Sequence, residues 1–502
     1  MSGFLSEECF ARISRRFAGG RRKVVLPGRI EVTPREGMHE MKKTSFFSVI
    51  VAAMASTATA MPTVSNVKMS VSDDREVEVT YDLANGPAVV TLSVETNNGS
   101  AWVAMDDKVV SRAMGDVNRK ITGSSGTITF VPEVELPVDT AAVRAKVTAW
   151  PMDDTPDYMV YSLAQKESNI PVDERVRYYA SSNALPGGLI DNVDYRMGLM
   201  VFRKIKAAGV TWTMGSDVDI EVSGKGYEDR EAAHEVTLFR NYYIAVFPLT
   251  QGQYRILKGA DDGSEDFVID RYMRIKARLT YDVIRGGNLY PANPNDSSLL
   301  GILRQTSGGA IDFDLPSEAE WEYACRAGYG HNYYGTGVQM QMTYANRLSD
   351  PEMDRIGRYR RNQATEWYVD GSGAVTLNQA NVISNSKNQG ITNGVPIAGS
   401  YAPNAWGLYD MLGGVMESCL DYYQVAEKVS AYNGAVNANS DKCLDGTTSS
   451  TRVRKGGSWS QNAFVCRPAY REGVAPGYVA DMLDTGLRVK CYMGLRKIDP
   501  EQ

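Results

Sequence analysis

Residues 452–471 read RVRKGGSWSQNAFVCRPAYR, and this stretch decides the fold and most of the functional argument. Two consecutive glycines, Gly456 and Gly457, permit backbone conformations that side chains exclude, so we expect a tight turn there. The indole of Trp459 follows, and Cys466 is the lone thiol of the stretch. Whether the protein is an enzyme depends mainly on this thiol and on the residue five positions before it.

The composition is that of a soluble globular protein with more than one domain. The chain has 502 residues, of which 43% are hydrophobic and 23% charged. Its net charge of -6 argues against nucleic acid or anionic membranes as partners. Six cysteines without CxxC spacing give no support for a zinc ribbon or a thioredoxin motif, and disulfide pairing cannot be read from the sequence. Three histidines leave little scope for a polyhistidine metal site.

A secretory signal peptide is predicted at residues 41–60, which read MKKTSFFSVIVAAMASTATA. Two lysines, a short apolar run and a small-residue end are typical of such a segment. The apolar run is too short for a transmembrane helix, so we expect no such segment in the mature chain. Translation is then expected to start at Met41, with residues 1–40 a mis-called start or disordered. The protein would be exported to the periplasm, the cell surface or the medium.

Residues 61–150 are predicted to form an antiparallel β-sandwich of immunoglobulin or fibronectin type. Runs with period-two alternation are separated by Asn-Gly and Gly-Ser turn signals. No chemistry is visible in this part, so a spacer or adhesion module is the expected role. Residues 151–196 are interpreted as a connector, and a second domain is expected over 197–502.

Two short helices stand out in the second domain. Thr250 and Gln253 fit a capping box before a helix that ends at Gly259, and Ser317 and Glu320 fit another before a helix that ends near Gly328. The carboxylates of the second helix are interpreted as structural. Residues 329–400 are rich in Gly, Asn and Tyr, which predicts a long loop region of the kind that often carries function.

Four ordered motifs resemble the formylglycine-generating-enzyme, or sulfatase-modifying factor, family. They are LPSEAEWEYACRAG, NAWGLYDMLGGVMES, RVRKGGSW and a closing GLRV at 486–489. The resemblance covers about residues 197–493. It implies an α+β, loop-rich fold of C-type-lectin-like type, preceded here by the β-sandwich.

The family's oxidases make formylglycine in sulfatases with Cu(I) held by two cysteines five residues apart, and two thiolates suit soft Cu(I). Cys466 matches the second cysteine and is the one candidate catalytic residue. Gln461 stands at the first position. Because an amide does not replace a thiolate, we do not expect copper, and the sequence leaves open whether the domain is an enzyme.

The resemblance also places a substrate groove and a calcium site. Ser458, Trp459 and Met416 match groove positions, although the family has Trp where this chain has Met416. The family's structural Ca²⁺ loop matches Asp410 and Glu417 by carboxylate, and Gly413 and Val415 by carbonyl. A second calcium site would begin at Asn346. In the alternative interpretation Asp410 caps a turn and Glu417 pairs with an arginine.

Two hypotheses of different class follow. The first is an exported, calcium-stabilised binding or structural module for a peptide or a glycan, which has lost the oxidase site. The second is a formylglycine-generating oxidase that acts through Cys466. A third possibility is a subunit or chaperone that binds a sulfatase-like protein without oxidising it.

Overall fold

The structure is a computed structural model and describes residues 25–26, 30–31, 60–137, 142–163, 171–216, 231, 233–259, 269–287, 292–340, 348–362, 367–369, 375–377, 394–423, 451–477 and 484–492. The chain divides into two compact units, residues 1–60 and 61–502. Of the first unit, only Ala60 and the strand pair β1 (Val25–Leu26) and β2 (Ile30–Glu31) are described. The predicted signal peptide and residues 1–40 therefore lie almost entirely outside the described residues.

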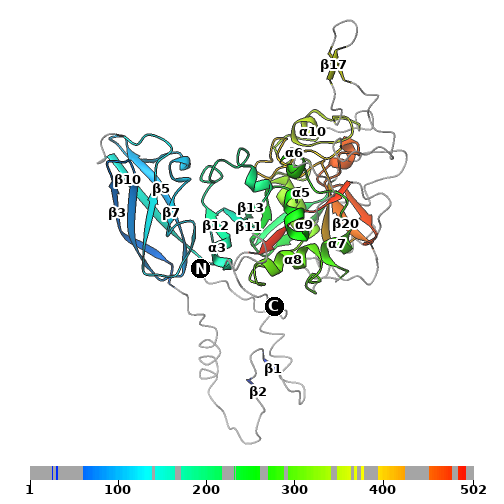
Figure 1. Cartoon of the computed structure of the whole chain (residues 1–502). Helices are drawn as coiled ribbons and strands as arrows, with labels where there is room; N and C mark the ends of the chain where they lie inside the picture. The colour runs from blue at the N-terminus through cyan, green and yellow to red at the C-terminus, as the bar shows by residue number, and fades with distance from the viewer. Residues whose placement is uncertain are drawn as a thin grey trace, which may run out of the picture. The chain divides into compact units, whose positions relative to one another are not determined.

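The predicted β-sandwich is confirmed. One sheet has the order β3-β4-β9-β7, and the other pairs β10, β5 and β6, with β8 also on β5. Figure 1 shows these strands in blue to cyan. The period-two alternation that predicted these strands corresponds to alternating burial: along β4, buried side chains alternate with more exposed ones. The strands are β3 (Thr63–Val71), β4 (Val77–Ala84), β5 (Ala88–Asn97), β6 (Trp102–Ala104), β7 (Met114–Gly115), β8 (Arg119–Ile121), β9 (Ser125–Phe130) and β10 (Val143–Pro151).

A five-stranded antiparallel sheet with the order β12-β11-β13-β16-β23 is the centre of the second part of the chain. Two of its strands come from residues 151–196, the stretch interpreted above as a connector, so the sheet begins before residue 197. The last strand comes from the end of the described chain. The strands are β11 (Tyr158–Ser162), β12 (Val176–Tyr179), β13 (Leu199–Ile205), β16 (Tyr242–Ala245) and β23 (Lys490–Tyr492).

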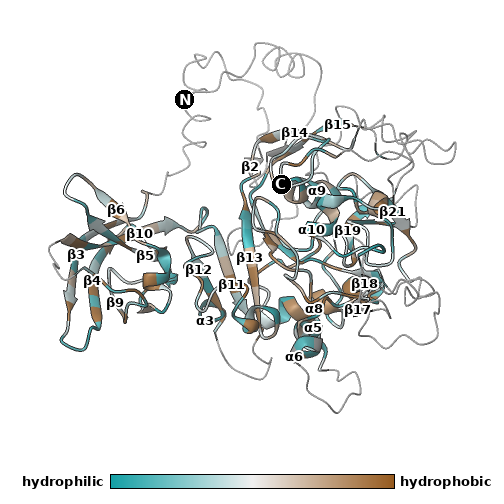
Figure 2. Cartoon of the chain, turned by 90° about the horizontal axis from the view of Figure 1, so that it is seen from above, coloured by the Kyte–Doolittle hydropathy of each residue, from teal (hydrophilic) through white to brown (hydrophobic). Residues whose placement is uncertain are grey.

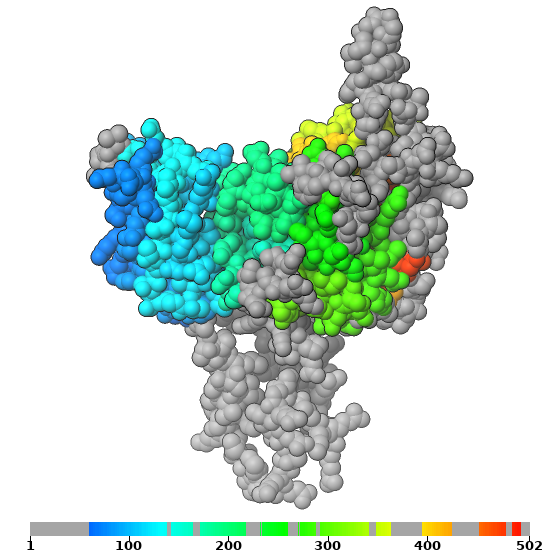
Figure 3. Space-filling view, in the orientation of Figure 1, coloured from blue at the N-terminus to red at the C-terminus, as the bar shows by residue number. Residues whose placement is uncertain are grey.

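A four-stranded sheet with the order β21-β20-β19-β22 carries the residues of the functional argument. β20 is buried at all four positions, and Figure 3 shows a small red to orange area of the C-terminal segments on the face drawn there. β14 and β15 form a separate hairpin, as do β17 and β18. These strands are β14 (Val210–Met214), β15 (His234–Leu238), β17 (Trp367–Val369), β18 (Val375–Leu377), β19 (Met416–Tyr422), β20 (Arg452–Lys455), β21 (Arg471–Val474) and β22 (Thr485–Gly486).

The helices are short, and Figure 2 shows teal and brown residues along them. Both predicted capping boxes are present: Thr250 with Gln253, and Ser317 with Glu320. Gly259 ends the first helix in the left-handed region; Ala327 does so for the second, one residue before the expected Gly328. The helices are α3 (Val172–Arg175), α5 (Gln251–Lys258), α6 (Ile269–Met273), α7 (Tyr281–Arg285), α8 (Leu299–Thr306), α9 (Glu318–Arg326) and α10 (Pro351–Ile356), with 3₁₀ helices η1 (Asp107–Val110), η3 (Val193–Arg196) and η6 (Ala463–Cys466).

The fold is therefore α+β, with short helices and long connecting loops around two main sheets, and an N-terminal β-sandwich. Its apolar core forms two clusters in the C-terminal part and one in the sandwich. Within the described residues, no helix is both long and apolar enough to cross a membrane.

Candidate functional site

The double-glycine turn after β20 packs against the core on both sides. Gly456 has φ +89°, and a Cβ there would lie 3.0 Å from the Trp321 ring. Gly457 has φ +67°, and a Cβ there would lie 2.5 Å from the Cys466 sulfur. Larger residues would need both a strained backbone and displaced neighbours. The close packing around the predicted turn therefore requires glycine at both positions.

Cys466 lies on η6 directly behind this turn and is fully buried. Its Sγ is 3.8 Å from the Ser458 carbonyl oxygen. Burial, with a smaller contribution from the Asp484 carboxylate, raises the pKa of the Cys466 thiol to about 12. The thiol is therefore protonated at neutral pH when no metal is bound, unlike that of a typical nucleophilic cysteine.

None of the other described cysteines forms a disulfide with Cys466. Cys325, Cys419 and Cys491 are buried and free, on α9, β19 and β23. Cys9 and Cys443 lie outside the described residues. Within the described part of the chain, no group of three or more His, Cys, Asp or Glu side chains is arranged to hold a metal ion.

Oxygen atoms surround the positions next to Cys466. The Ser458 hydroxyl donates to Asp484 Oδ2 at 2.6 Å, and the Ser460 hydroxyl donates to the same oxygen at 3.0 Å. The Gln461 side-chain oxygen is 3.4 Å from Ser458 Oγ. Asp484 Oδ1 faces Arg454 Nη1 at 3.8 Å. Asp484 was missed by sequence reasoning, since it stands 26 residues from Ser458 and only its place before the GLRV motif could have indicated it.

The three predicted groove residues differ in accessibility. Met416 and Ser458 are fully buried, on β19 and in the turn. Trp459 is half-buried, and its backbone N–H donates to the Gly414 carbonyl. Of the three, only Trp459 presents surface to a ligand.

The two predicted calcium-binding carboxylates, Glu417 and Asp410, have different partners. Glu417 is fully buried and lies within 3.2 Å of the Arg488 guanidinium through both oxygens; Trp321 Nε1 donates to it at 2.6 Å. This is the arginine pair of the alternative interpretation. Asp410 accepts from the Gly399 N–H through Oδ2. Its Oδ1 is buried and has no hydrogen-bond partner among the described residues.

Of the two predicted calcium-binding carboxylates, Asp410 is therefore the one with an oxygen that a cation could still bind. Burial raises the pKa of its carboxyl to about 6, although the Gly399 N–H and the Arg488 charge favour the ionised form. The second predicted calcium residue, Asn346, lies outside the described residues.

The carboxylates of α9 form ion pairs with β20 and β21, which supports the structural role expected from the sequence. Glu322 lies 2.9 Å from Lys455 Nζ and 2.8 Å from Arg326, and it also accepts from the Gly215 N–H. Burial alone would raise its pKa, but Lys455 and Arg326 hold it at about 2. Glu318 pairs with Arg471. Because Lys455, Arg326, Glu318 and Glu322 are buried and Arg471 is largely so, these pairs fix the position of β20 and hence of the turn that follows it.

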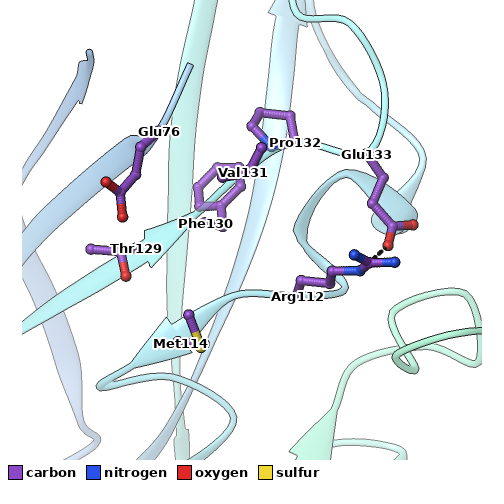
Figure 4. Close-up of a pocket in the computed structure, with 8 residues that line it drawn as sticks. All are labelled: Glu76, Arg112, Met114, Thr129, Phe130, Val131, Pro132 and Glu133. Atoms are coloured by element: carbon purple, nitrogen blue, oxygen red, sulfur yellow. Dashed lines mark ion pairs between the residues drawn. The ribbon is translucent and has the colours of Figure 1, made fainter. Parts of the chain in front are cut away.

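Hollows formed by the described residues differ in size and place. A cavity of about 10 Å³ lies beside the calcium-type loop and is lined in part by Asp410, Met411 and Cys325. An open hollow of about 590 Å³ lies on the β-sandwich. Figure 4 shows Phe130, Val131 and Met114 along it, with the ion pair of Arg112 and Glu133 at one end. The cavity beside the calcium-type loop is too small for a substrate side chain.

Comparisons with known proteins concern the C-terminal part of the chain. Residues 272–491 match the family described as sulfatase-modifying factor enzyme 1-like domain. The chain is 24% identical over 295 residues to mouse formylglycine-generating enzyme, a match that covers 52% of this chain and 66% of that one. It is 25% identical over 266 residues to serine/threonine-protein kinase pkn1 of Chlamydia pneumoniae, covering 51% of this chain and 34% of the kinase.

The chain therefore spans less than two thirds of the length of these relatives. Among solved structures, Treponema denticola variable protein 1 aligns with a TM-score of 0.39 at 17% identity, covering 59% of this chain and 95% of that one. PvdO from Pseudomonas aeruginosa aligns with a TM-score of 0.38 at 19% identity, covering 58% and 94%. With the four sequence motifs and the family match in agreement, residues 272–491 form a sulfatase-modifying factor enzyme 1-like domain.

Proposed function

We propose that the protein is an exported binding module that keeps the sulfatase-modifying factor scaffold without its copper oxidase chemistry. One observation carries the proposal: Cys466 is fully buried behind Gly457, where a Cβ would lie 2.5 Å from the Cys466 sulfur. Gln461 occupies the position of the first copper-binding cysteine of the resembled family. The substrate thiol of an oxidase would have to reach this place, and the described residues leave it no opening.

The donor atoms next to Cys466 do not fit copper. Cu(I) is a soft ion that prefers thiolate and thioether ligands. The side chains that follow the double-glycine turn here are the hydroxyls of Ser458 and Ser460, which bond to each other and to the carboxylate of Asp484. The residues around Cys466 therefore give no support for copper-dependent oxidation by this chain.

Calcium is the metal that we propose for the neighbouring loop, in a structural role. The unpartnered Oδ1 of Asp410 is the observation that supports it, because a buried carboxylate oxygen without a donor gains most from a cation. The carbonyls of Gly413 and Val415 would complete the set from the same loop. Glu417 is already neutralised by Arg488 and would contribute little. The ion would supply positive charge and tie the loop together.

The ligand of the module is proposed to be a glycan or a peptide, held near Trp459. The β-sandwich would serve as a spacer or adhesion module, and the signal peptide predicted at residues 41–60 supports export to the periplasm, the cell surface or the medium. The alternative, a formylglycine-generating oxidase, is favoured by one specific observation. The Gly-Gly-Ser-aromatic turn and Cys466 keep the spacing of the family that the sequence resembles.

A direct assay separates the two functions. The full chain, and its Cys466→Ala variant as the matched control, are loaded with Cu(I) and incubated with a Cys-x-Pro-x-Arg peptide under oxygen. Aldehyde is then trapped with a hydroxylamine and measured by mass spectrometry. We expect no aldehyde above the level of copper without protein. Aldehyde that forms with the unchanged protein and disappears in Cys466→Ala would overturn the proposal and establish the oxidase.

A further inference from the structure

Arg452, the first residue of β20, is a fully buried cation. Its guanidinium carbon lies 3.5 Å from the centre of the Tyr422 ring and 4.6 Å from the centre of the Tyr281 ring. Arg452 Nη1 donates to the Leu420 carbonyl at 2.7 Å. Contacts with β19 and α7 therefore hold the Arg452 side chain in one place.

The other two nitrogens of this guanidinium, Nε and Nη2, are buried and have no hydrogen-bond partner among the described residues. No carboxylate in the described part of the chain pairs with Arg452 either. The tyrosine rings attract a cation through their faces, but they do not accept the in-plane N–H groups that Nε and Nη2 offer. Burial of this charge therefore has a desolvation cost that hydrogen bonds to an anion would offset.

Other buried arginines of the same domain use these two nitrogens to hold a carboxylate. Arg285 donates from Nε and Nη2 to the two oxygens of Asp314, at 2.9 Å each. Arg488 donates from Nε to Glu417 Oε2 at 3.0 Å and from Nη2 to Glu417 Oε1 at 2.9 Å. Nε and Nη2 carry parallel N–H groups along one edge of the guanidinium, and the two oxygens of a carboxylate match them. Arg452 presents this same edge.

Charge and shape select the class of anion. Arg452 carries a single positive charge, so a monoanion would neutralise it, whereas a dianion such as sulfate would leave a buried negative charge. A carboxylate brings one oxygen to each of the two N–H groups, but chloride has only one atom to share between them. A singly charged anion with two oxygens on one carbon fits both requirements.

Arg452 is buried, but it lies close to the surface along the chain. It pairs with Val474 at the end of β21, and the next residue, Ala475, is exposed. Thr451, directly before Arg452, is half-buried. The ends of strands open locally at low cost, so an anion of a few atoms can reach the guanidinium without unfolding of the domain.

We propose that Arg452 binds one small monocarboxylate, or bicarbonate, with one oxygen on Nε and the other on Nη2. The bound anion neutralises the buried cation and fixes the start of β20. Because the double-glycine turn follows the same strand, the anion also helps to hold that turn in place. The site goes beyond the proposed function and makes the stability of the domain depend on the anion.

Calorimetry and thermal unfolding of the full chain, dialysed into sodium chloride without carboxylates, test the proposal. Formate, acetate and bicarbonate are added separately at constant ionic strength, with sulfate as the dianion for comparison. We expect one carboxylate or bicarbonate ion to bind per chain, and the tightest of the three identifies the source. At about a tenfold excess over its dissociation constant, the unfolding midpoint should rise by about 3 °C. Sulfate should not bind at this site.

Variants place the binding at Arg452. Arg452→Met keeps an unbranched apolar stem beside the rings, so it should fold, and it should show neither binding nor a midpoint shift. Arg452→Lys keeps the charge but loses the two parallel N–H groups, and it should weaken the affinity at least about tenfold. The matched control is Arg255→Met. It removes an arginine whose guanidinium carbon lies 5.1 Å from the centre of the Tyr272 ring, and it should leave the response unchanged.

Three results would overturn the proposal: no response to any of the three anions, a response that survives in Arg452→Met, or equal binding of sulfate. A site that took chloride equally well would give the first result, because the background salt would already fill it. If Arg452→Met does not fold, calorimetry of Arg452→Lys decides, and an affinity equal to that of the unchanged protein would reject the site. None of these outcomes depends on the aldehyde assay.

Discussion

Gly457 and Cys466 are packed so closely that a Cβ at position 457 would lie 2.5 Å from the Cys466 sulfur. The Cys466 Cα and the Val465 carbonyl are within 2.8 Å of the same point. The turn thus closes over the thiol with no space between them. The contact ties the most recognisable motif of the chain to the burial of its candidate catalytic residue.

Gly457→Ala is therefore expected to destabilise the C-terminal domain by about 3 kcal/mol, from overpacking added to backbone strain. Gly259→Ala is the matched control. Its φ of +61° is close to the +67° of Gly457, but no atom lies within 4 Å of its Cβ position. It should cost only about 1 kcal/mol of strain. Urea unfolding measures both, and equal losses would contradict the packing argument.

Cys466 should resist alkylation in the native protein. Its sulfur is fully buried, and a pKa of about 12 leaves almost no thiolate at pH 8. Iodoacetamide followed by peptide mass spectrometry should find Cys466 unmodified before unfolding and fully modified in denaturant. Labelling of the folded protein at the rate of a free cysteine would show that the thiol is accessible, and would revive the oxidase interpretation.

Glu322→Gln is expected to cost about 3–5 kcal/mol of unfolding free energy, because it leaves Lys455 and Arg326 buried beside an uncharged group. Arg355→Gln, which breaks the exposed pair with Glu352, provides the control and should cost at most about 1 kcal/mol. Denaturant titrations of both variants give the comparison. A loss for Glu322→Gln no larger than that of the control would show that β20 is held mainly by apolar contacts.

Stability should fall as the pH rises from about 4 to 7. Burial, and then the neighbouring Glu318 charge, raises the pKa of Asp421 to about 7, whereas an unfolded aspartate titrates near 3.9. Between these values the folded state binds more protons than the unfolded state, so the unfolding free energy decreases with pH. Asp421→Asn imitates the protonated acid and should flatten this slope. A slope unchanged in the variant would show that Asp421 titrates normally.

Calcium should raise the midpoint of thermal unfolding at pH 7.5, and a chelator should lower it. A hundredfold excess over the dissociation constant corresponds to about 2.7 kcal/mol. Asp410→Asn removes the charged oxygen at the unpartnered position and should abolish the shift, while Asp421→Asn should keep it. A shift that survives in Asp410→Asn would place the ion elsewhere.

Local patterns predicted the local structure well. Both capping boxes were readable because a helix start is specified within four residues, and the sandwich strands were readable because their alternation matches one buried face. β11 and β12 were missed. Their residues YMVYS and VRYY are short runs without clear alternation, and β11 is buried over four of its five positions, so no face pattern marks it.

The geometry of the site depends on contacts between residues that are far apart in the sequence, and the sequence alone does not reveal these contacts. Motif spacing located Cys466, Trp459 and Gln461, but could not tell that Ser458 and Met416 are fully buried. The partner of Lys455 stands 133 residues away, and that of Glu417 stands 71 residues away. Pairings over such separations arise from the tertiary fold, so the choice between calcium and arginine at Glu417 needed the structure.

The position of β23 has a consequence for how the chain acquires its fold. This last described strand completes the sheet that begins with β12 and β11, and Arg488 bonds to the Val246 carbonyl across 242 residues of sequence. The sandwich is formed by residues 60–151 alone and can fold while synthesis continues. The sheet of the second domain must wait for residues 490–492, so we expect it to form late and to be lost when β23 is removed.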